Sequence, residues 1–177
     1  MKTLFRCAVA VVSLGLAVGA LAQTPAPPTS LTVRGDVQKP GVLTPEDVKK
    51  QFAAELHSTK YTAGHDKQEK TAVGVPLVSV IKAAELKTAP TPKHYDLSFI
   101  VILEAHDGYR AFFSMAELSK RGEENKTLLV VEEDGKPLSG QDAPFKLLTE
   151  GGDRRIFGIT GITLVDGIKL SDGLGKK

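Results

Sequence analysis

The stretch from Leu97 to Leu118 constrains the fold of this chain more than any other segment. It begins with a run of β-forming residues and continues with Asp107-Gly108, a strong signal for a tight turn between two strands. A second strand is predicted over Tyr109 to Phe113. Ser114 then stands where a helix N-cap would stand, with Glu117 three residues later. The stretch therefore predicts a β-hairpin that leads directly into a short helical turn.

The first 22 residues have the three parts of a secretory signal peptide. Lys2 and Arg6 supply a positive n-region, Cys7 to Leu21 is apolar, and Ala20-Leu21-Ala22 is a small-x-small cleavage site. The apolar stretch is too short and wrongly flanked for a membrane anchor. We expect cleavage after Ala22 and a periplasmic or secreted mature chain that is not held in a membrane.

Cleavage would change the chemistry of the chain. Cys7 is the only cysteine, so the mature chain would have neither a disulfide nor a thiolate metal ligand. Loss of Lys2 and Arg6 would lower Lys+Arg from 23 to 21, which equals the number of Asp+Glu residues. A chain near neutrality lacks the basic surface of a nucleic-acid-binding protein, so we expect no nucleic-acid partner.

The patterns along the chain predict one α+β domain. Residues 23–30 are typical of a Pro-rich extended leader, residues 31–170 have the length of a single domain, and residues 171–177 are typical of a solvated tail. Two or three short helices are expected, among them one from Thr44 to near His57 and one from Pro76 to Leu86. Seven or eight short strands are interleaved irregularly with them, which favours a mixed β-sheet.

Two adjacent arginines form the first candidate for a binding site. Arg154 and Arg155 follow the Gly-rich turn 151–153, and guanidinium groups bind phosphates and other oxyanions bidentately. The alternative is that both occupy successive, solvated strand positions. The other arginine that attracts notice belongs to the tripeptide 34–36, RGD, which we interpret as a strand-ending glycine turn and not as an adhesion signal.

The histidines have no metal-ligand spacing. His65 and His106 each precede an aspartate at a predicted turn, where solvation of a polar side chain explains them. A site assembled in space from both is the alternative. No residue is predicted to be catalytic or to bind a metal.

Six short motifs follow one another in an order that is informative as a set, although no single motif is specific. They are Val33 to Val37 with Pro40-Gly41 and Leu43-Thr44; Gly74 to Leu77; Asp107 to Tyr109 with Phe113 to Leu118; Leu128 to Val130 with Asp134 to Leu138; Ala143 to Leu148; and Arg154 before Ile159 to Ile162. This order resembles the sulfite-oxidase-like, or oxidoreductase molybdopterin-binding, domain superfamily over nearly all of residues 31–166.

The resemblance implies a mixed α+β fold, a buried pyranopterin and a cysteine thiolate that binds molybdenum for oxygen-atom transfer. That cysteine would fall between Ser58 and Ala72, and this segment contains none. Where the family commonly has arginine, this chain has Lys146, and the aromatic residue usually next to Arg154 is replaced by Arg155. Because a soft metal needs the thiolate, bound molybdenum is not expected, whereas the resemblance leaves molybdopterin itself open.

We therefore expect an exported, non-catalytic binding or accessory module, whose partner is a small anionic ligand or a protein. Its pocket is expected near Arg154 and the turn of Asp107 and Tyr109, with the tyrosine stacking on the ligand or donating a hydrogen bond to it, and with Lys146 and Arg154 holding an anion. One alternative is an oxidoreductase that binds a pterin without cysteine ligation. The other is a polysaccharide-binding module, because Val33 to Leu43 is similar to the opening of soluble-ligand-binding β-grasp domains of export proteins.

Overall fold

The computed structural model describes residues 28–64, 67–119, 127–149 and 154–174. The predicted signal peptide, most of the leader and the last three residues lie outside these ranges, and so does His65. Among the helices in the described ranges, none has the length and apolar character needed to cross a membrane.

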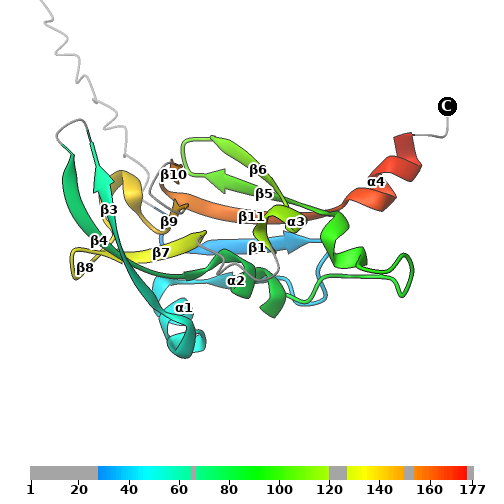
Figure 1. Cartoon of the computed structure of the whole chain (residues 1–177), viewed down its shortest axis with the longest axis horizontal. Coiled ribbons are helices and arrows are strands. Elements are labelled where there is room, and N and C mark those ends of the chain that lie inside the picture. Colours follow the sequence, from blue (N-terminus) through cyan, green and yellow to red (C-terminus); the bar gives the residue numbers. More distant parts are fainter. Residues whose placement is uncertain (1–27, 65–66, 120–126, 150–153, 175–177) are drawn as a thin grey trace, which may run out of the picture.

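Five strands form the first sheet, in the order β2-β1-β11-β5-β6 (Figure 1). β1 pairs with β11 in parallel, and the other neighbours are antiparallel, so the sheet is mixed as predicted. The strand that opens the domain thus lies beside one of the last strands in the chain. The bounds are β1 Leu31–Gly35, β2 Gly41–Leu43, β5 Phe99–Ala105, β6 Arg110–Ser114 and β11 Ile159–Asp166.

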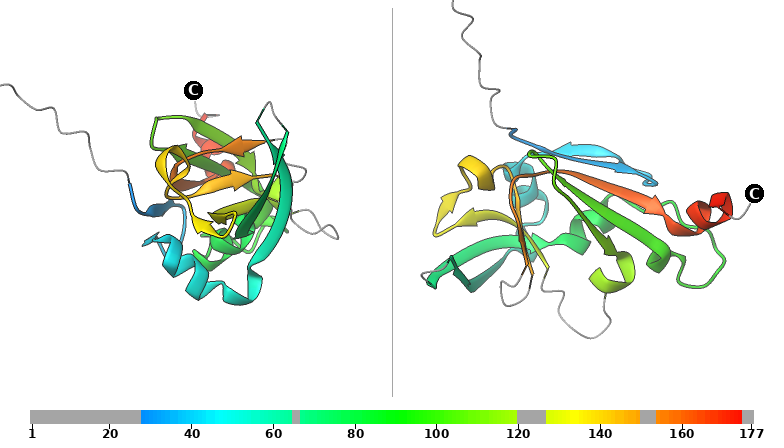
Figure 2. Two further views of the ribbon diagram at one scale, coloured as in Figure 1. Left: turned by 90° about the vertical axis from the view of Figure 1, so that its left-hand side faces the viewer. Right: turned by 90° about the horizontal axis from the view of Figure 1, so that it is seen from above.

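The second sheet is antiparallel, with the order β10-β9-β7-β4-β3 and with β8 paired to β7. Residues 58–63 and 68–72 belong to the hairpin formed by β3 and β4. This hairpin lies at the opposite end of the molecule from α4 (Figure 2). The bounds are β3 His57–Ala63, β4 Gln68–Pro76, β7 Leu128–Glu133, β8 Lys136–Pro137, β9 Lys146–Leu148 and β10 Arg155–Ile156.

The described residues contain four short α-helices, where two or three helices were predicted. They are α1 Pro45–Gln51, α2 Leu77–Ala83, α3 Met115–Leu118 and α4 Gly167–Leu174. Three 3₁₀ turns are also present: η1 Ala53–Glu55, η2 Tyr95–Ser98 and η3 Gly140–Asp142. The mixed α+β fold class is therefore confirmed.

Both predicted helices are shorter in the structure, since α2 ends at Ala83 and not at Leu86, and α4 was not predicted. α1 ends at Gln51 because the chain from His57 onward pairs with β4 over seven residues, and strand pairing prevails over helical periodicity. α4 continues to Leu174, four residues into the predicted tail. Its first turn is held by the Asp166 carboxylate, which accepts hydrogen bonds from the backbone N–H groups of Ile168 (3.0 Å) and Lys169 (3.2 Å).

The predicted hairpin and cap in Leu97 to Leu118 are present. The strands β5 and β6 flank the turn at Gly108, which has a φ of 86°. The Ser114 hydroxyl accepts a hydrogen bond from the backbone N–H of Glu117 (3.0 Å) at the start of α3. Alternate residues of β5, beginning with Phe99, are buried, so one face of the hairpin belongs to the core.

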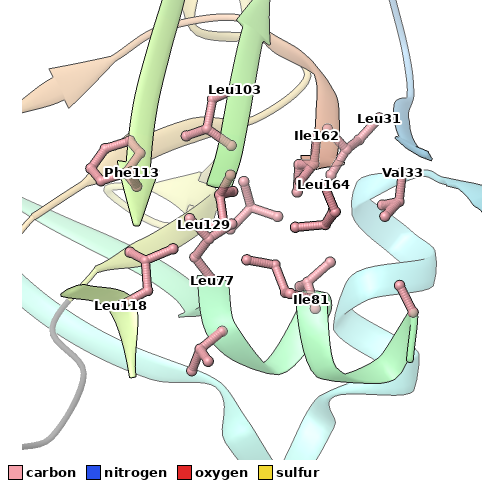
Figure 3. Close-up of a cluster of buried hydrophobic side chains, with 14 of the residues drawn as sticks. Leu31, Val33, Leu77, Ile81, Leu103, Phe113, Leu118, Leu129, Ile162 and Leu164 are labelled. Carbon is pink, nitrogen blue, oxygen red and sulfur yellow. The ribbon is translucent and has the colours of Figure 1, made fainter. Parts of the chain in front are cut away.

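The main core lies between the two sheets and α2. Figure 3 shows side chains from β1, β5 and β11 meeting side chains from β7 and α2. Leu77 and Ile81 on α2, and Leu129 on β7, are completely buried there. The fold thus leaves the opposite face of the first sheet, on which the candidate site lies, free of this cluster. The labelled core residues are Leu31, Val33, Leu77, Ile81, Leu103, Phe113, Leu118, Leu129, Ile162 and Leu164.

Candidate functional site

The predicted site residues Asp107 and Tyr109 lie at the β5–β6 turn, and both are exposed. The Asp107 carboxylate accepts a hydrogen bond from the backbone N–H of Tyr109 (2.9 Å), which stabilises the turn. The Tyr109 side chain is 53% exposed. The other two predicted residues lie at the second sheet: Lys146 is the first residue of β9, and Arg154 directly precedes β10.

Lys146 is buried in an ionic cluster and is therefore occupied by other protein groups. Its side chain is 4% exposed, and its Nζ lies 2.6 Å from a carboxylate oxygen of Glu133 and 2.8 Å from the Tyr61 hydroxyl oxygen. A second carboxylate, on Asp142, lies 3.4 Å away. Lys70 donates to the other Glu133 oxygen, and Tyr61 also donates to this glutamate. The lysine thus neutralises buried carboxylates and has no exposed charge to offer an anion.

Hydrogen bonds within the cluster favour the charged forms of Glu133 and Lys146. Burial works against the charge of Glu133, but hydrogen bonds from Lys146, Lys70 and Tyr61 prevail and lower its pKa to about 2. Burial likewise opposes the charge of Lys146, yet the hydrogen bonds to Glu133 and Tyr61 raise the pKa of the ammonium group. Burial, together with the hydrogen bond to Glu133, raises the pKa of Tyr61.

Aromatic rings complete the surroundings of the buried lysine. Lys146 Nζ lies 5.3 Å from the ring centroid of Tyr61 and 5.1 Å from that of Phe157. Tyr61 and Ala72 also belong to a second, smaller apolar cluster with residues of β7 and β9. In the 58–72 segment, where the resemblance would place the metal-binding cysteine, Tyr61 of β3 and Ala72 of β4 thus pack against side chains of β7 and β9 in the same sheet.

The two adjacent arginines point to different partners and do not form a clamp. The Arg154 guanidinium lies 4.5 Å from the ring centroid of Phe113 on β6. Arg155 lies 5.9 Å from the Tyr61 ring and donates a hydrogen bond to the carbonyl oxygen of Thr62 (3.2 Å). Arg155 is the first residue of β10 and Arg154 directly precedes it, and neighbouring side chains in an extended segment point to opposite faces.

An open cleft of about 390 Å³ lies beside the turn that contains Asp107 and Tyr109, on the first sheet. Arg34 of β1 and Arg110 of β6 lie on either side of it, and Glu104 of β5 lies between them. Glu104 accepts a hydrogen bond from Arg34, and its other carboxylate oxygen lies 3.2 Å from Arg110 Nη2. The residues that line the cleft are Arg34, Glu104, Ala105, Gly108, Arg110 and Thr160.

A β-bulge in β11 creates room for this arrangement. The register between β11 and β5 shifts between Ile159 and Gly161, which places Gly161 opposite Glu104. A Cβ atom at Gly161 would lie 2.9 Å from a carboxylate oxygen of Glu104. The missing side chain thus lets the Glu104 side chain extend across β11 toward Arg34, which also donates to the Thr163 hydroxyl (3.1 Å).

The cleft has a net charge of +1 and unused donors. The side chains of Arg34 and Arg110 are 52% and 64% exposed, whereas that of Glu104 is 19% exposed. Each guanidinium carries five N–H donors, and Glu104 with Thr163 engages only part of them. This arrangement is able to bind an anion between the two arginines, although the anion shares their N–H donors with the Glu104 carboxylate.

Sequence analysis missed all three charged residues of the cleft. Arg34 was interpreted only as part of a glycine turn, and that interpretation is confirmed, because Gly35 ends β1 with a φ of 100°. Glu104 and Arg110 were within reach of prediction, since a hairpin centred on Asp107-Gly108 places them opposite each other. Arg34 and Glu104 belong to strands that are far apart in the sequence, so no local sequence pattern indicates their contact.

The described residues offer no obvious metal centre. Among them, no group of three or more His, Cys, Asp or Glu side chains is arranged to hold an ion. His106 lies at the β5–β6 turn, where its Nε2 is 3.3 Å from the carbonyl oxygen of Gln141. Its proposed partner, His65, lies outside the described residues.

No family model matches this chain, and no protein of curated function matches it.

Proposed function

We propose that this chain is a non-catalytic binding module for a small anion, which it holds in the cleft between Arg34 and Arg110. The observation that carries the proposal is a pair of exposed guanidinium groups that face one another across Glu104 on a bulged sheet. Guanidinium donors pair bidentately with carboxylate, sulfate and phosphate, and two of them suit one oxyanion. The position beside Asp107 and Tyr109 agrees with the pocket expected from the sequence, with different basic residues.

The proposal keeps the sulfite-oxidase-like scaffold and omits its metal. The mixed sheet and the order of the motifs support the scaffold. The residues present do not fit molybdenum, because 58–72 contains no thiolate and its residues Tyr61 and Ala72 pack into an apolar cluster. We therefore derive no redox step. Export remains part of the proposal and rests on residues 1–22.

Calorimetric titration with acetate, sulfate and phosphate tests the proposal. We expect saturable binding to the wild-type chain and an affinity about tenfold lower for Arg34→Gln and Arg110→Gln, since each removes charge-assisted hydrogen bonds worth about 1.5–3 kcal/mol. Arg154→Gln is the matched control and should bind like the wild type. Absence of binding, or a loss confined to Arg154→Gln, would overturn the proposal.

The alternative of a pterin-dependent oxidoreductase is tested separately. The protein is expressed in the presence of molybdate, and the purified chain is analysed for molybdenum and for extractable pterin. Stoichiometric molybdenum or pterin would contradict a non-catalytic module. A colourless protein without either would remove the oxidoreductase alternative.

One observation supports the polysaccharide-binding alternative. The segment similar to β-grasp domains forms β1 and β2, and a cleft of about 500 Å³ lies against β2 and α1. Polar side chains of Asp47, Lys50 and Gln51 line it, and such groups hydrogen-bond sugar hydroxyls. A glycan array on which the wild-type chain binds nothing would remove this alternative, whereas binding abolished by Gln51→Ala would favour it over the arginine cleft.

A further inference from the structure

Four apolar side chains continue from the arginine cleft along the outer face of the first sheet. They form what we call the apolar strip, which consists of Ile100, Ile102, Phe112 and Val165. On β5, the two isoleucines alternate with buried core residues, so they point away from the core. None of the four belongs to either apolar cluster or packs against one. The strip is therefore a partly exposed apolar surface outside both apolar clusters.

The strand register makes the strip continuous. Ile102 lies opposite Phe112 of β6, and Ile100 lies opposite Val165 of β11. Phe112 is 60% exposed, and the other three side chains are partly exposed. Single exposed apolar residues are common on proteins, whereas a contiguous apolar patch on one face, here one exposed and three partly exposed side chains, is typical of an interaction site.

The apolar strip and the arginine cleft lie next to each other on the same face of the first sheet. Glu104 and Arg110 face each other two residues along the strands from Ile102 and Phe112, on the same side of the sheet. Arg34 lies opposite Thr163, which lies opposite Ile102. From Glu104 to Ile100 the strand covers about 13 Å at roughly 3.3 Å per residue. A ligand held by the arginines would thus have an apolar path of that length beside it.

We propose that the anion bound by this module is an amphipathic carboxylate with an unbranched hydrocarbon chain of medium length. Its carboxylate lies between Arg34 and Arg110, and its chain lies along the apolar strip. The inference rests on the proposed function and adds the class of ligand. Charge complementarity supports this occupant, because two arginines and one glutamate leave a single positive charge at one end of the strip, which matches one carboxylate.

The test measures affinity as a function of chain length. Butanoate, hexanoate and octanoate are titrated into the wild-type chain at concentrations where the acids stay monomeric. Full burial of one methylene strengthens binding about fourfold, so an open face that covers one side of the chain should give about twofold. We expect octanoate to bind at least tenfold more tightly than butanoate. Octanol, which has the same chain without the charge, should bind at least tenfold more weakly than octanoate.

Variants separate the two ends of the ligand. The double variant Ile102→Thr/Phe112→Thr keeps β-forming residues on the strands and should bind butanoate like the wild type, while its octanoate affinity falls to the butanoate level. Val42→Thr is the matched control, because Val42 is 61% exposed on the far edge strand β2 and lies outside the strip.

Each other outcome overturns a specific part of the account. Butanoate binding without dependence on chain length overturns the inference and leaves the proposed function intact. Equal binding of octanol and octanoate, or no binding of any acid, overturns both. Binding to anionic vesicles without binding to octanoate would assign the strip to a membrane surface. Sedimentation that shows a dimer in the wild type and a monomer in the double variant, without octanoate binding, would assign the strip to a second copy.

Discussion

Each sheet contains a glutamate that is paired with basic side chains. The two groups of charges differ in how far they are buried, and therefore in whether they can bind a ligand. In the second sheet, Lys146 and Glu133 are almost completely buried, and each has its partners within the protein. In the first sheet, Arg34 and Arg110 are more than half exposed and share Glu104, which is only partly buried. A buried pair whose groups are satisfied has nothing to offer a ligand, and removal of one partner destabilises the fold because the other charge is left buried and uncompensated. An exposed pair contributes little to stability and keeps donors for an anion.

The largest expected effect is the loss of Glu133. Glu133→Gln keeps the shape of the side chain but leaves the Lys146 ammonium buried without its principal countercharge. We expect the free energy of unfolding to fall by about 3 to 5 kcal/mol, measured by urea denaturation at pH 7. Anion binding at the first sheet should be unchanged in the folded variant. A loss below about 1 kcal/mol would show that the cluster is not the structural element described here.

Acid pH should produce an effect of similar or slightly smaller size. The folded pKa of Glu133 lies below its usual value, so its contribution to stability is present above about pH 5 and is lost as the pH falls toward 2. The shift from 4.5 to about 2 corresponds to about 3 kcal/mol. Denaturation curves at a series of pH values measure this loss.

The control for the pH series is Glu133→Gln, in which this part of the acid dependence should disappear. The raised pKa of Lys146 has the opposite sign, since its contribution is present at pH 7 and is lost only as the pH rises through that pKa. An identical acid profile in the wild type and the variant would contradict the assignment of the low pKa to Glu133.

The smallest expected effect sharpens the comparison at the other glutamate. Glu104→Gln should change the free energy of unfolding by less than about 1 kcal/mol, because its partners are exposed to water. Acetate and sulfate should bind this variant several-fold more tightly, since the arginines no longer share their donors with a carboxylate. Denaturation and calorimetry on the same preparation measure both quantities. Weaker binding would mean that Glu104 positions the arginines and does not compete with the ligand.

Local signals predicted much of the fold. The turn at Asp107-Gly108 and the cap at Ser114 each depend on residues close in the sequence, and both are present. The α+β class followed from the order of such segments. The end of α1 was not predictable in this way, because it depends on the pairing of β3 with β4 farther along the chain.

The cleft of the proposed site lies beside Asp107 and Tyr109, which were predicted to line a pocket, but Arg34 and Arg110 line it in place of the predicted Lys146 and Arg154. Lys146 was predicted to face a ligand, although it stands in the apolar run from Phe145 to Leu148, where a lysine signals a buried, paired charge. Arg34 meets Glu104 only because β1 and β5 both pair with β11. One sequence contains no signal for that contact, since it depends on a parallel pairing between the two ends of the domain.

The most direct test of the account is an NMR titration of the wild-type chain with butanoate, followed at arginine side-chain Nε–H and backbone amide signals. We predict saturable shifts at Arg34 and Arg110 and at the neighbouring amides of Gly108 and Thr160, with Lys146 and Tyr61 unaffected. Saturable shifts confined to Lys146 and Tyr61, or the absence of any saturable shift at the two arginines, would contradict the account.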